Sequence, residues 1–155
     1  ANTLVYDNLI ENNNNASMSP EKAAVRIAPI GVGIHLLATD NAEVYDNTIR
    51  NNRANGIIIF SLAHNAPNGK SDVGLLAEGN WLHGNIYENN AVVLDEVTNI
   101  PLVTKDIFWD GLGSRNRFNE RNATSFPPML PANGWPAPLH RAYGNILTFL
   151  IGLLS

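Results

Sequence analysis

The stretch Val5-Tyr6-Asp7-Asn8-Leu9-Ile10-Glu11-Asn12-Asn13 decides the fold, because it returns almost unchanged as Val44-Tyr45-Asp46-Asn47-Thr48-Ile49-Arg50-Asn51-Asn52. Asn8 of the first copy corresponds to Asn47 of the second. A looser copy, Leu82-His83-Gly84-Asn85-Ile86-Tyr87-Glu88-Asn89-Asn90, follows after a nearly equal interval. The weakest copy, Asn116-Arg117-Phe118-Asn119-Glu120-Arg121-Asn122, follows after a shorter one. Such recurrence indicates a repeat architecture.

A second repeated segment shows that the repeating unit is shorter than the interval between Asn8 and Asn47. Gly33-Ile34-His35-Leu36-Leu37 precedes the second copy, and Gly56-Ile57-Ile58-Ile59-Phe60 follows it. The step from Gly33 to Gly56 makes the basic unit about 23 residues long, a length typical of stacked repeats. The longer spacings contain insertions, which we place at 14–32, 61–80 and 97–113.

Each unit predicts three short strands joined by asparagine-rich bends. Apolar and polar residues alternate, as they do in strands, with Val44 on the first strand, Ile49 on the second and Ile57 on the third. The chain holds 23 asparagines, a residue that suits bends and disfavours helix interiors. Stacked units would align asparagines about 4.8 Å apart, close enough for their side chains to hydrogen-bond along a column. The column we predict contains Asn8, Asn47, Asn85 and Asn116.

These motifs resemble the parallel β-helix repeat proteins of the pectate-lyase-like superfamily. The likeness is greatest to the C-terminal part of bacterial exported parallel β-helix repeat proteins, and it covers roughly residues 1–123. It implies an all-β fold, a right-handed parallel β-helix of about four to five rungs with long loop insertions. It also implies an extracytoplasmic location, whether periplasmic, cell-surface or secreted.

Two positions depart from the pattern. Tyr87 falls where Ile10 and Ile49 predict an inward aliphatic side chain, so the third copy is expected to be shifted or bulged. Gly113 falls where a core residue is expected.

Both ends of a stack of rungs need a cover. Residues 124–155 form a Pro-rich C-terminal wrap and an apolar tail, which we assign to one domain with 1–123. The apolar run 146–154 is too short to span a bilayer. It is expected to be a final strand or short helix over the last rung or the lateral face, or else a docking tail. For the first rung we expect either a longer β-helix, of which this chain is the C-terminal part, or a covering partner.

Composition excludes several classes of protein. There is no cysteine, and the net charge is −4 with scattered basic residues, which argues against nucleic-acid binding. We expect no cofactor. We also expect no specific metal site, because an aspartate-rich calcium repeat is lacking near Asp95 and Glu96.

The outward side chains of the third strand of each unit are mostly apolar. We predict that they are Leu37, Ile58, Phe60 and Val93, with two ionisable groups, His35 and Asp95. An apolar strip of this kind requires a cover or a partner. His35 and Asp95 are weak candidates for a catalytic base and its carboxylate, and Lys70 and Asp72 in the second insertion are weaker ones.

Charged and aromatic residues gather near the fourth unit. Trp109, Arg115 and Arg117 lie close in sequence to Asp106 and Asp110, a combination that suits sugar recognition. Alternatively, Trp109 closes the terminal rung. With Leu37, Ile58 and Phe60, the residues Trp109, Arg115 and Arg117 are our candidate binding residues.

Three functions remain open. The chain is a non-catalytic scaffold or binding module for a partner protein or surface polysaccharide, or a subunit of a larger assembly joined through rung ends or its apolar tail. The alternative is an enzyme of the uronate lyase or C5-epimerase type. Its site would then lie in a missing N-terminal part, since an enzyme acting on uronates needs cations beside a base.

Overall fold

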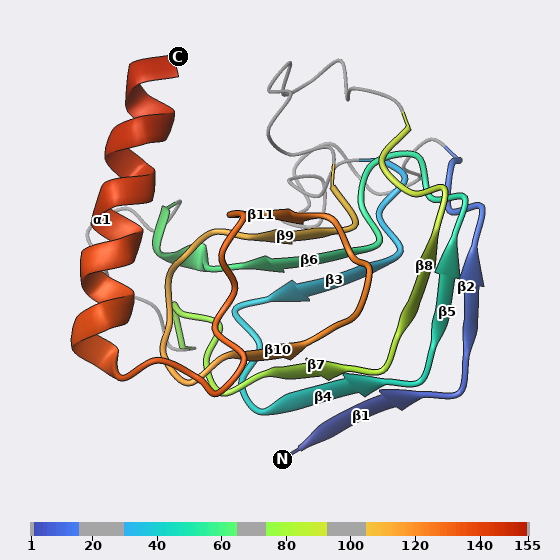
Figure 1. Ribbon diagram of the computed structural model, residues 1–155, viewed down its shortest axis with the longest axis horizontal. Helices are drawn as coiled ribbons and strands as arrows, with labels where there is room; N and C mark the ends of the chain where they lie inside the picture. Colours follow the sequence, from blue (N-terminus) through green and yellow to red (C-terminus); the bar gives the residue numbers. More distant parts are fainter. Residues whose placement is uncertain (1, 16–29, 65–73, 93–104, 155) are drawn as a thin grey trace.

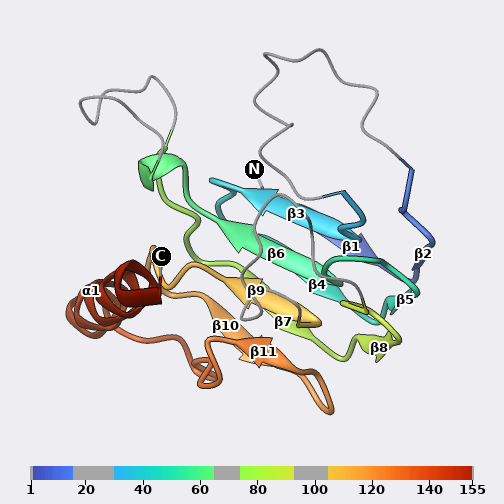
Figure 2. The same ribbon diagram turned by 90° about the horizontal axis from the view of Figure 1, so that it is seen from above.

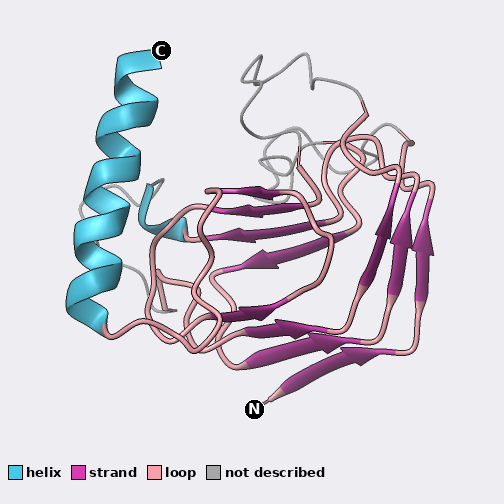
Figure 3. Ribbon diagram, in the orientation of Figure 1, coloured by secondary structure: helices cyan, strands magenta, loops and turns pink. Residues whose placement is uncertain are grey.

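The computed structural model describes residues 2–15, 30–64, 74–92 and 105–154, and the regular secondary structure in this part is mostly β-strand (Figure 3). Three parallel sheets contain all of its strands (Figure 1). Sheet A consists of β1 (Thr3–Tyr6), β4 (Ala42–Tyr45), β7 (Trp81–His83) and β10 (Arg117–Asn119). Sheet B consists of β2 (Leu9–Glu11), β5 (Thr48–Arg50) and β8 (Ile86–Glu88). Sheet C consists of β3 (Ile34–Leu37), β6 (Ile57–Phe60), β9 (Ile107–Trp109) and β11 (Ser125–Phe126).

The chain visits the sheets in the order A, B, C three times, and in its fourth circuit it passes from β10 of sheet A to β11 of sheet C without a strand in sheet B (Figure 1). We call one such circuit a rung, so that β4, β5 and β6 form the second rung. The predicted register is confirmed for the first three rungs, since Val5 pairs with Val44 and Val44 with Leu82. Parallel strands in this order, with the asparagine ladders described below, are compatible with a parallel β-helix.

Two expectations about irregular positions were wrong. Tyr87 pairs in register with Ile49, so the third copy is neither shifted nor bulged. Its ring occupies the inward column, and its hydroxyl donates to Glu120 at 2.9 Å. Gly113 is not the residue that continues the Val5 column, because Phe118 pairs with Leu82 at that place.

The bends between sheets A and B explain the recurring Asp-Asn pair. Asp7, Asp46 and Gly84 precede the ladder asparagines with φ of 54°, 52° and 67°. Aspartate, asparagine and glycine tolerate this left-handed conformation better than other residues. At Gly84 a Cβ would also lie 2.5 Å from Asp46 Oδ1, so a larger residue there would require the Asp46 side chain to move.

Asparagine ladders connect the rungs at these bends. Asn8 donates from its backbone N and from Nδ2 to Asn47 Oδ1, at 3.1 and 2.9 Å. Asn47 makes the same two bonds to Asn85 Oδ1, at 3.0 and 2.9 Å. A parallel ladder joins Asn13, Asn52 and Asn90 at the next bend. Because Asn47 and Asn52 are fully buried, these bonds satisfy groups that water does not reach.

The column assignment of Asn116 was wrong. Asn116 accepts from the backbone N and Nδ2 of Asn80, in a third ladder that precedes the sheet A strands. The Asn8 column instead ends on Glu120, whose carboxylate accepts from both nitrogens of Asn85 as well as from Tyr87. Desolvation raises the pKa of Glu120, although these hydrogen bonds oppose the rise.

The C-terminal segment closes the far end of the stack. Residues 127–136 cross the fourth rung, where Pro131 and Trp135 accept backbone hydrogen bonds from Phe118 and Arg115. Helix α1 (Ala137–Leu154) then stands beside the corner between sheets C and A (Figures 1 and 2). A Cβ at Gly144 would lie 2.9 Å from Leu112 Cδ2, so this glycine lets the helix approach the corner.

His140 of α1 is a buried polar group without a hydrogen-bond partner among the described residues. Its side chain is 2% exposed, and neither ring nitrogen has a hydrogen bond there. The ring packs edge-on against Trp109 and Trp135, with centroids 5.1 and 5.9 Å away. Burial lowers the pKa of His140, while the charge of Glu78 acts in the opposite direction.

The ladders predict a large loss of folding stability when the amide side chain of a central rung is removed. We expect Asn47→Ala to lower the free energy of unfolding by roughly 2–4 kcal/mol, because several buried polar groups lose their partners. Chemical denaturation measures this. The matched control is Asn145→Ala on the exposed side of α1, expected to change stability by less than about 0.5 kcal/mol. Equal effects of the two substitutions would contradict the ladder account.

The burial of His140 predicts that acid weakens the packing of α1. The folded pKa lies below the unfolded value of 6.5, so the unfolded chain binds the proton first and stability falls as the pH drops through that value. We expect His140→Leu to lose less stability than the wild type between about pH 8 and about pH 5. Denaturation followed by tryptophan fluorescence compares the two, and identical losses would refute this role for His140.

Candidate functional site

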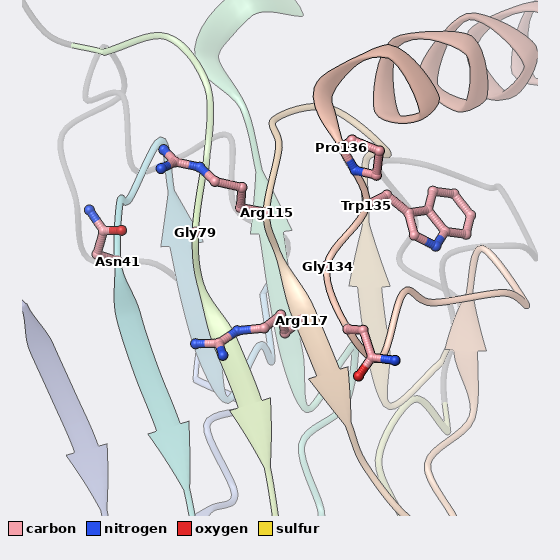
Figure 4. Close-up of a pocket in the computed structure, with 8 residues that line it drawn as sticks. Asn41, Gly79, Arg115, Arg117, Gly134, Trp135 and Pro136 are labelled. Atoms are coloured by element: carbon pink, nitrogen blue, oxygen red, sulfur yellow. The ribbon is translucent and has the colours of Figure 1, made fainter.

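An open pocket of about 480 Å³ lies at the edge of sheet A, beside the segment that crosses the fourth rung. Its wall includes Asn41, Gly79, Arg115, Arg117 and residues 133–136. Figure 4 shows the Arg115 and Arg117 side chains extending the same way, past Gly79 toward Asn41. Of the described residues that line the pocket, none is acidic and none is a histidine.

The two arginines are positioned by backbone and aromatic contacts. The Arg115 backbone N–H donates to Trp135 O at 3.4 Å, and Arg115 itself has a φ of 62°. Arg117 Cζ lies 4.3 Å from the centroid of the Trp81 ring, a favourable cation–π distance. Neither guanidinium has an ion pair within the described residues. The pocket thus gathers two positive charges on a chain with a net charge of −4.

The outer face of sheet A extends away from this pocket. Tyr6, Tyr45 and His83 form one outward column, with ring centroids 5.0 and 5.1 Å apart and nearly parallel planes. Because these rings stack on one another, they present edges rather than faces to the outside. In the neighbouring column Glu43 pairs with Trp81, and Trp81 with Arg117.

A histidine–carboxylate pair lies on the same face. His83 Nε2 is 3.0 Å from Glu43 Oε1, and both side chains are about one quarter to one third exposed. Desolvation and the nearby acidic groups raise the pKa of Tyr45. Its phenol therefore stays protonated near neutral pH.

The apolar strip predicted on the outer side of sheet C exists in part, and Leu147 of helix α1 packs against it. Ile58 pairs with Phe108, and these side chains form a second core with Phe126 and Leu147 of α1. Ile58 is only 4% exposed, so its side chain offers little surface to a ligand. Leu37 and Phe60 pair beside it and remain partly exposed.

The strand that pairs with β6 differs from the expected one. Asp95 and Val93 were expected in the next strand of this face, but β6 pairs with β9, which lies inside the predicted third insertion. Burial lowers the pKa of His35, which pairs in register with Ile58. The catalytic candidates Asp95, Lys70 and Asp72 fall outside the described residues.

Trp109 does not reach the pocket. It is fully buried, and its Nε1 donates to Leu112 O at 3.0 Å, so its side chain offers no surface to a ligand. It belongs to the core cluster of the stack. Asp110 is also buried and accepts from the backbone of Ser61 and Leu112. Only Arg115 and Arg117 of that predicted cluster line the pocket.

The described residues offer neither a metal centre nor a membrane-crossing helix. No group of three or more histidine and acidic side chains there is placed to hold a metal ion. No helix in the same ranges has the length and apolar character required to cross a membrane.

Comparison with known proteins gives no further assignment, since no family model, curated protein or solved structure matches the chain. The fold and the site therefore rest on the repeats, the registers and the contacts described above.

Sequence reasoning missed the outer face of sheet A. The signal was present, because Tyr6, Tyr45 and His83 recur at the repeat spacing and alternate with the core column of Val5 and Val44. The sequence prediction placed the binding surface only on the third strand of each unit.

Proposed function

We propose that the chain is a right-handed parallel β-helix of the pectate-lyase-like kind that serves as a non-catalytic binding module for an anionic surface polysaccharide outside the cytoplasm. The repeated unit, the in-register sheets and the asparagine ladders support the fold. The location follows from the resemblance of the repeats to exported proteins.

The observation that supports binding is the arginine pair. Arg115 and Arg117 extend in one direction into an open pocket whose described lining lacks a carboxylate (Figure 4). Guanidinium groups bind carboxylates and sulfates through paired, charge-assisted hydrogen bonds. A polymer that carries such groups at regular intervals would enter along the outer face of sheet A, where Asn119 and Trp81 lie next to Arg117.

The described pocket favours binding over catalysis. Proton abstraction from a uronate requires a base next to the cation that neutralises the carboxylate. The described lining of the pocket offers cations and amides, with no base among them. The stacked rings of Tyr6, Tyr45 and His83 likewise offer no free ring face for a sugar between them.

One observation favours the alternative, an enzyme of the lyase or C5-epimerase type. The Glu43–His83 pair lies on the same outer face as Arg117, and the contact would orient the imidazole as a base. We keep this as the second candidate function.

The binding proposal predicts charge-dependent affinity. Arg115→Gln and Arg117→Gln should each weaken binding of polygalacturonate oligomers by about fivefold to tenfold, and added salt should weaken binding to the wild type. Isothermal titration calorimetry measures the affinities. Arg121→Gln, an exposed cation outside the pocket, is the control and should bind as the wild type does. Binding of neutral glucans with equal affinity would overturn the proposal.

The enzyme alternative has its own test. A lyase would release an unsaturated uronate that absorbs ultraviolet light, and an epimerase would exchange the C5 proton with deuterated water. We expect neither signal from the wild type. A signal that His83→Ala abolishes, with oligomer binding preserved, would establish the enzyme in place of the non-catalytic module.

A further inference from the structure

The segment that closes the stack carries an asparagine–glycine pair in the wall of the pocket. The backbone N–H groups of Phe118 and Arg115 donate to Pro131 O and Trp135 O, at 3.1 and 3.4 Å. These two bonds hold the segment alongside β10 in the opposite direction. Asn133 is midway in sequence between the two acceptors, so it lies opposite the start of β10, and it lines the pocket together with the two arginines.

Close packing explains the glycine of this pair. Gly134 has a φ of 73°, a conformation that glycine adopts more readily than other residues. A Cβ at Gly134 would lie 3.2 Å from Arg117 Cγ and 3.4 Å from Arg115 O. A side chain there would push the segment away from β10. The asparagine–glycine pair therefore lies directly against the part of the chain that carries the two arginines.

The surroundings of Asn133 leave its side chain free to react with the backbone that follows. Asn133 is exposed in a turn, and its amide has no hydrogen bond within the described residues. The backbone nitrogen of a glycine is easily reached by the preceding side chain, because no Cβ shields it. An exposed asparagine followed by glycine is thus the arrangement in which the side-chain amide is most readily lost.

Another asparagine–glycine pair of the described chain is protected from this reaction. Asn55, which precedes Gly56, is 2% exposed, and its Nδ2 donates to Lys105 O at 2.7 Å. Its carbonyl oxygen accepts from Gly33 N at 2.9 Å. The bend at Asn55 would have to open locally before the amide could react, because the amide is bonded and water does not reach it. The two pairs share a sequence and differ in their surroundings.

We propose that Asn133 is a site of spontaneous deamidation, and that the carboxylate formed there blocks anion binding in the arginine pocket. The Gly134 nitrogen loses its proton to a solvent base and bonds to Asn133 Cγ. The bond between Cγ and Nδ2 breaks, and Nδ2 leaves as ammonia after taking a proton from water. Water then adds to either carbonyl of the five-membered imide, and the ring opens to aspartate or isoaspartate. No atom is oxidised or reduced, and the solvent supplies every other reactant.

The new charge acts directly on the ligand site. The described lining of the pocket lacks a carboxylate, and residue 133 would supply one beside Arg115 and Arg117. This carboxylate would compete with a ligand anion for the guanidinium groups and would repel that anion. The regulation rests on the binding function proposed above, whereas the deamidation itself does not. Asn133 would thereby limit the time for which the pocket binds an anionic ligand.

Ageing of the whole chain tests the chemistry. The protein is incubated at neutral pH, and peptide mapping by mass spectrometry follows the conversion of each asparagine. We expect Asn133 to convert at least about tenfold faster than Asn55, whose reaction requires local opening. Equal or slower conversion at Asn133 would overturn the proposal. The pair Asn68–Gly69 lies outside the described residues, and fragment spectra assign its conversion separately.

The effect of the charge is tested with a variant that carries the product side chain. In Asn133→Asp, nuclear magnetic resonance follows the titration of the new carboxylate. We expect its pKa to lie below that of an ordinary aspartate, because two guanidinium groups share its surroundings. Adding Arg115→Gln and Arg117→Gln should raise this pKa. A pKa that the two arginine substitutions leave unchanged would overturn the proposal, whether or not the pocket binds a polysaccharide.

Binding measurements separate this inference from the function on which it rests. Wild type and Asn133→Gln are incubated side by side and then titrated with polygalacturonate oligomers. Glutamine closes its larger ring more slowly, so Asn133→Gln should keep its own starting affinity. The converted wild type should bind at least about tenfold more weakly than the fresh protein. Equal losses in both proteins, or no loss after conversion, would overturn the inference and leave the binding function intact. No binding by the fresh wild type would refute the binding function, and with it the regulation.

Discussion

The need to satisfy buried amides at the bends between sheets governs this structure. A chain that turns sharply every few residues leaves backbone groups inside the corners, where water cannot reach them. Asn47, Asn52, Asn80 and Asn116 are fully buried and bridge successive rungs with side-chain and backbone bonds. These ladders set the register, and the register in turn separates the core columns from the outward columns on which the candidate site depends.

The ends of the stack differ because the ladders have a direction. At one end Glu120 stops a ladder with an acceptor-only group, and a proline-rich segment and α1 complete the closure. At the other end, Asn8 and Asn13 continue the two ladders, and no described residue caps them. The closure leaves His140 as a buried imidazole with no hydrogen bond from the described residues. The arginine pocket lies where the closing segment meets sheet A, so the same segment both caps the fold and forms the site.

The repeats made the strands and three of the four members of the predicted asparagine column readable from sequence alone. Asn8, Asn47 and Asn85 align as expected, because near-identical copies strongly favour a single register. The prediction failed where copies were weak. Asn116 was assigned to the column because it is an asparagine. The residue that ends the column is Glu120, which has a carboxylate in place of an amide. The pairing of β9 with β6 was missed because an insertion separates them. The pocket depends on residues 133–136, whose path across the last rung no repeat encodes.

The ladder claim is tested most directly by hydrogen exchange of asparagine side-chain amides, followed by nuclear magnetic resonance in deuterated water. The account predicts slow exchange of the Nδ2 protons of Asn47, Asn52, Asn80 and Asn85, which donate within the stack, and fast exchange for exposed asparagines such as Asn133 and Asn145. Equally fast exchange for both groups would contradict the account, because the rungs would then not be held together by buried ladders.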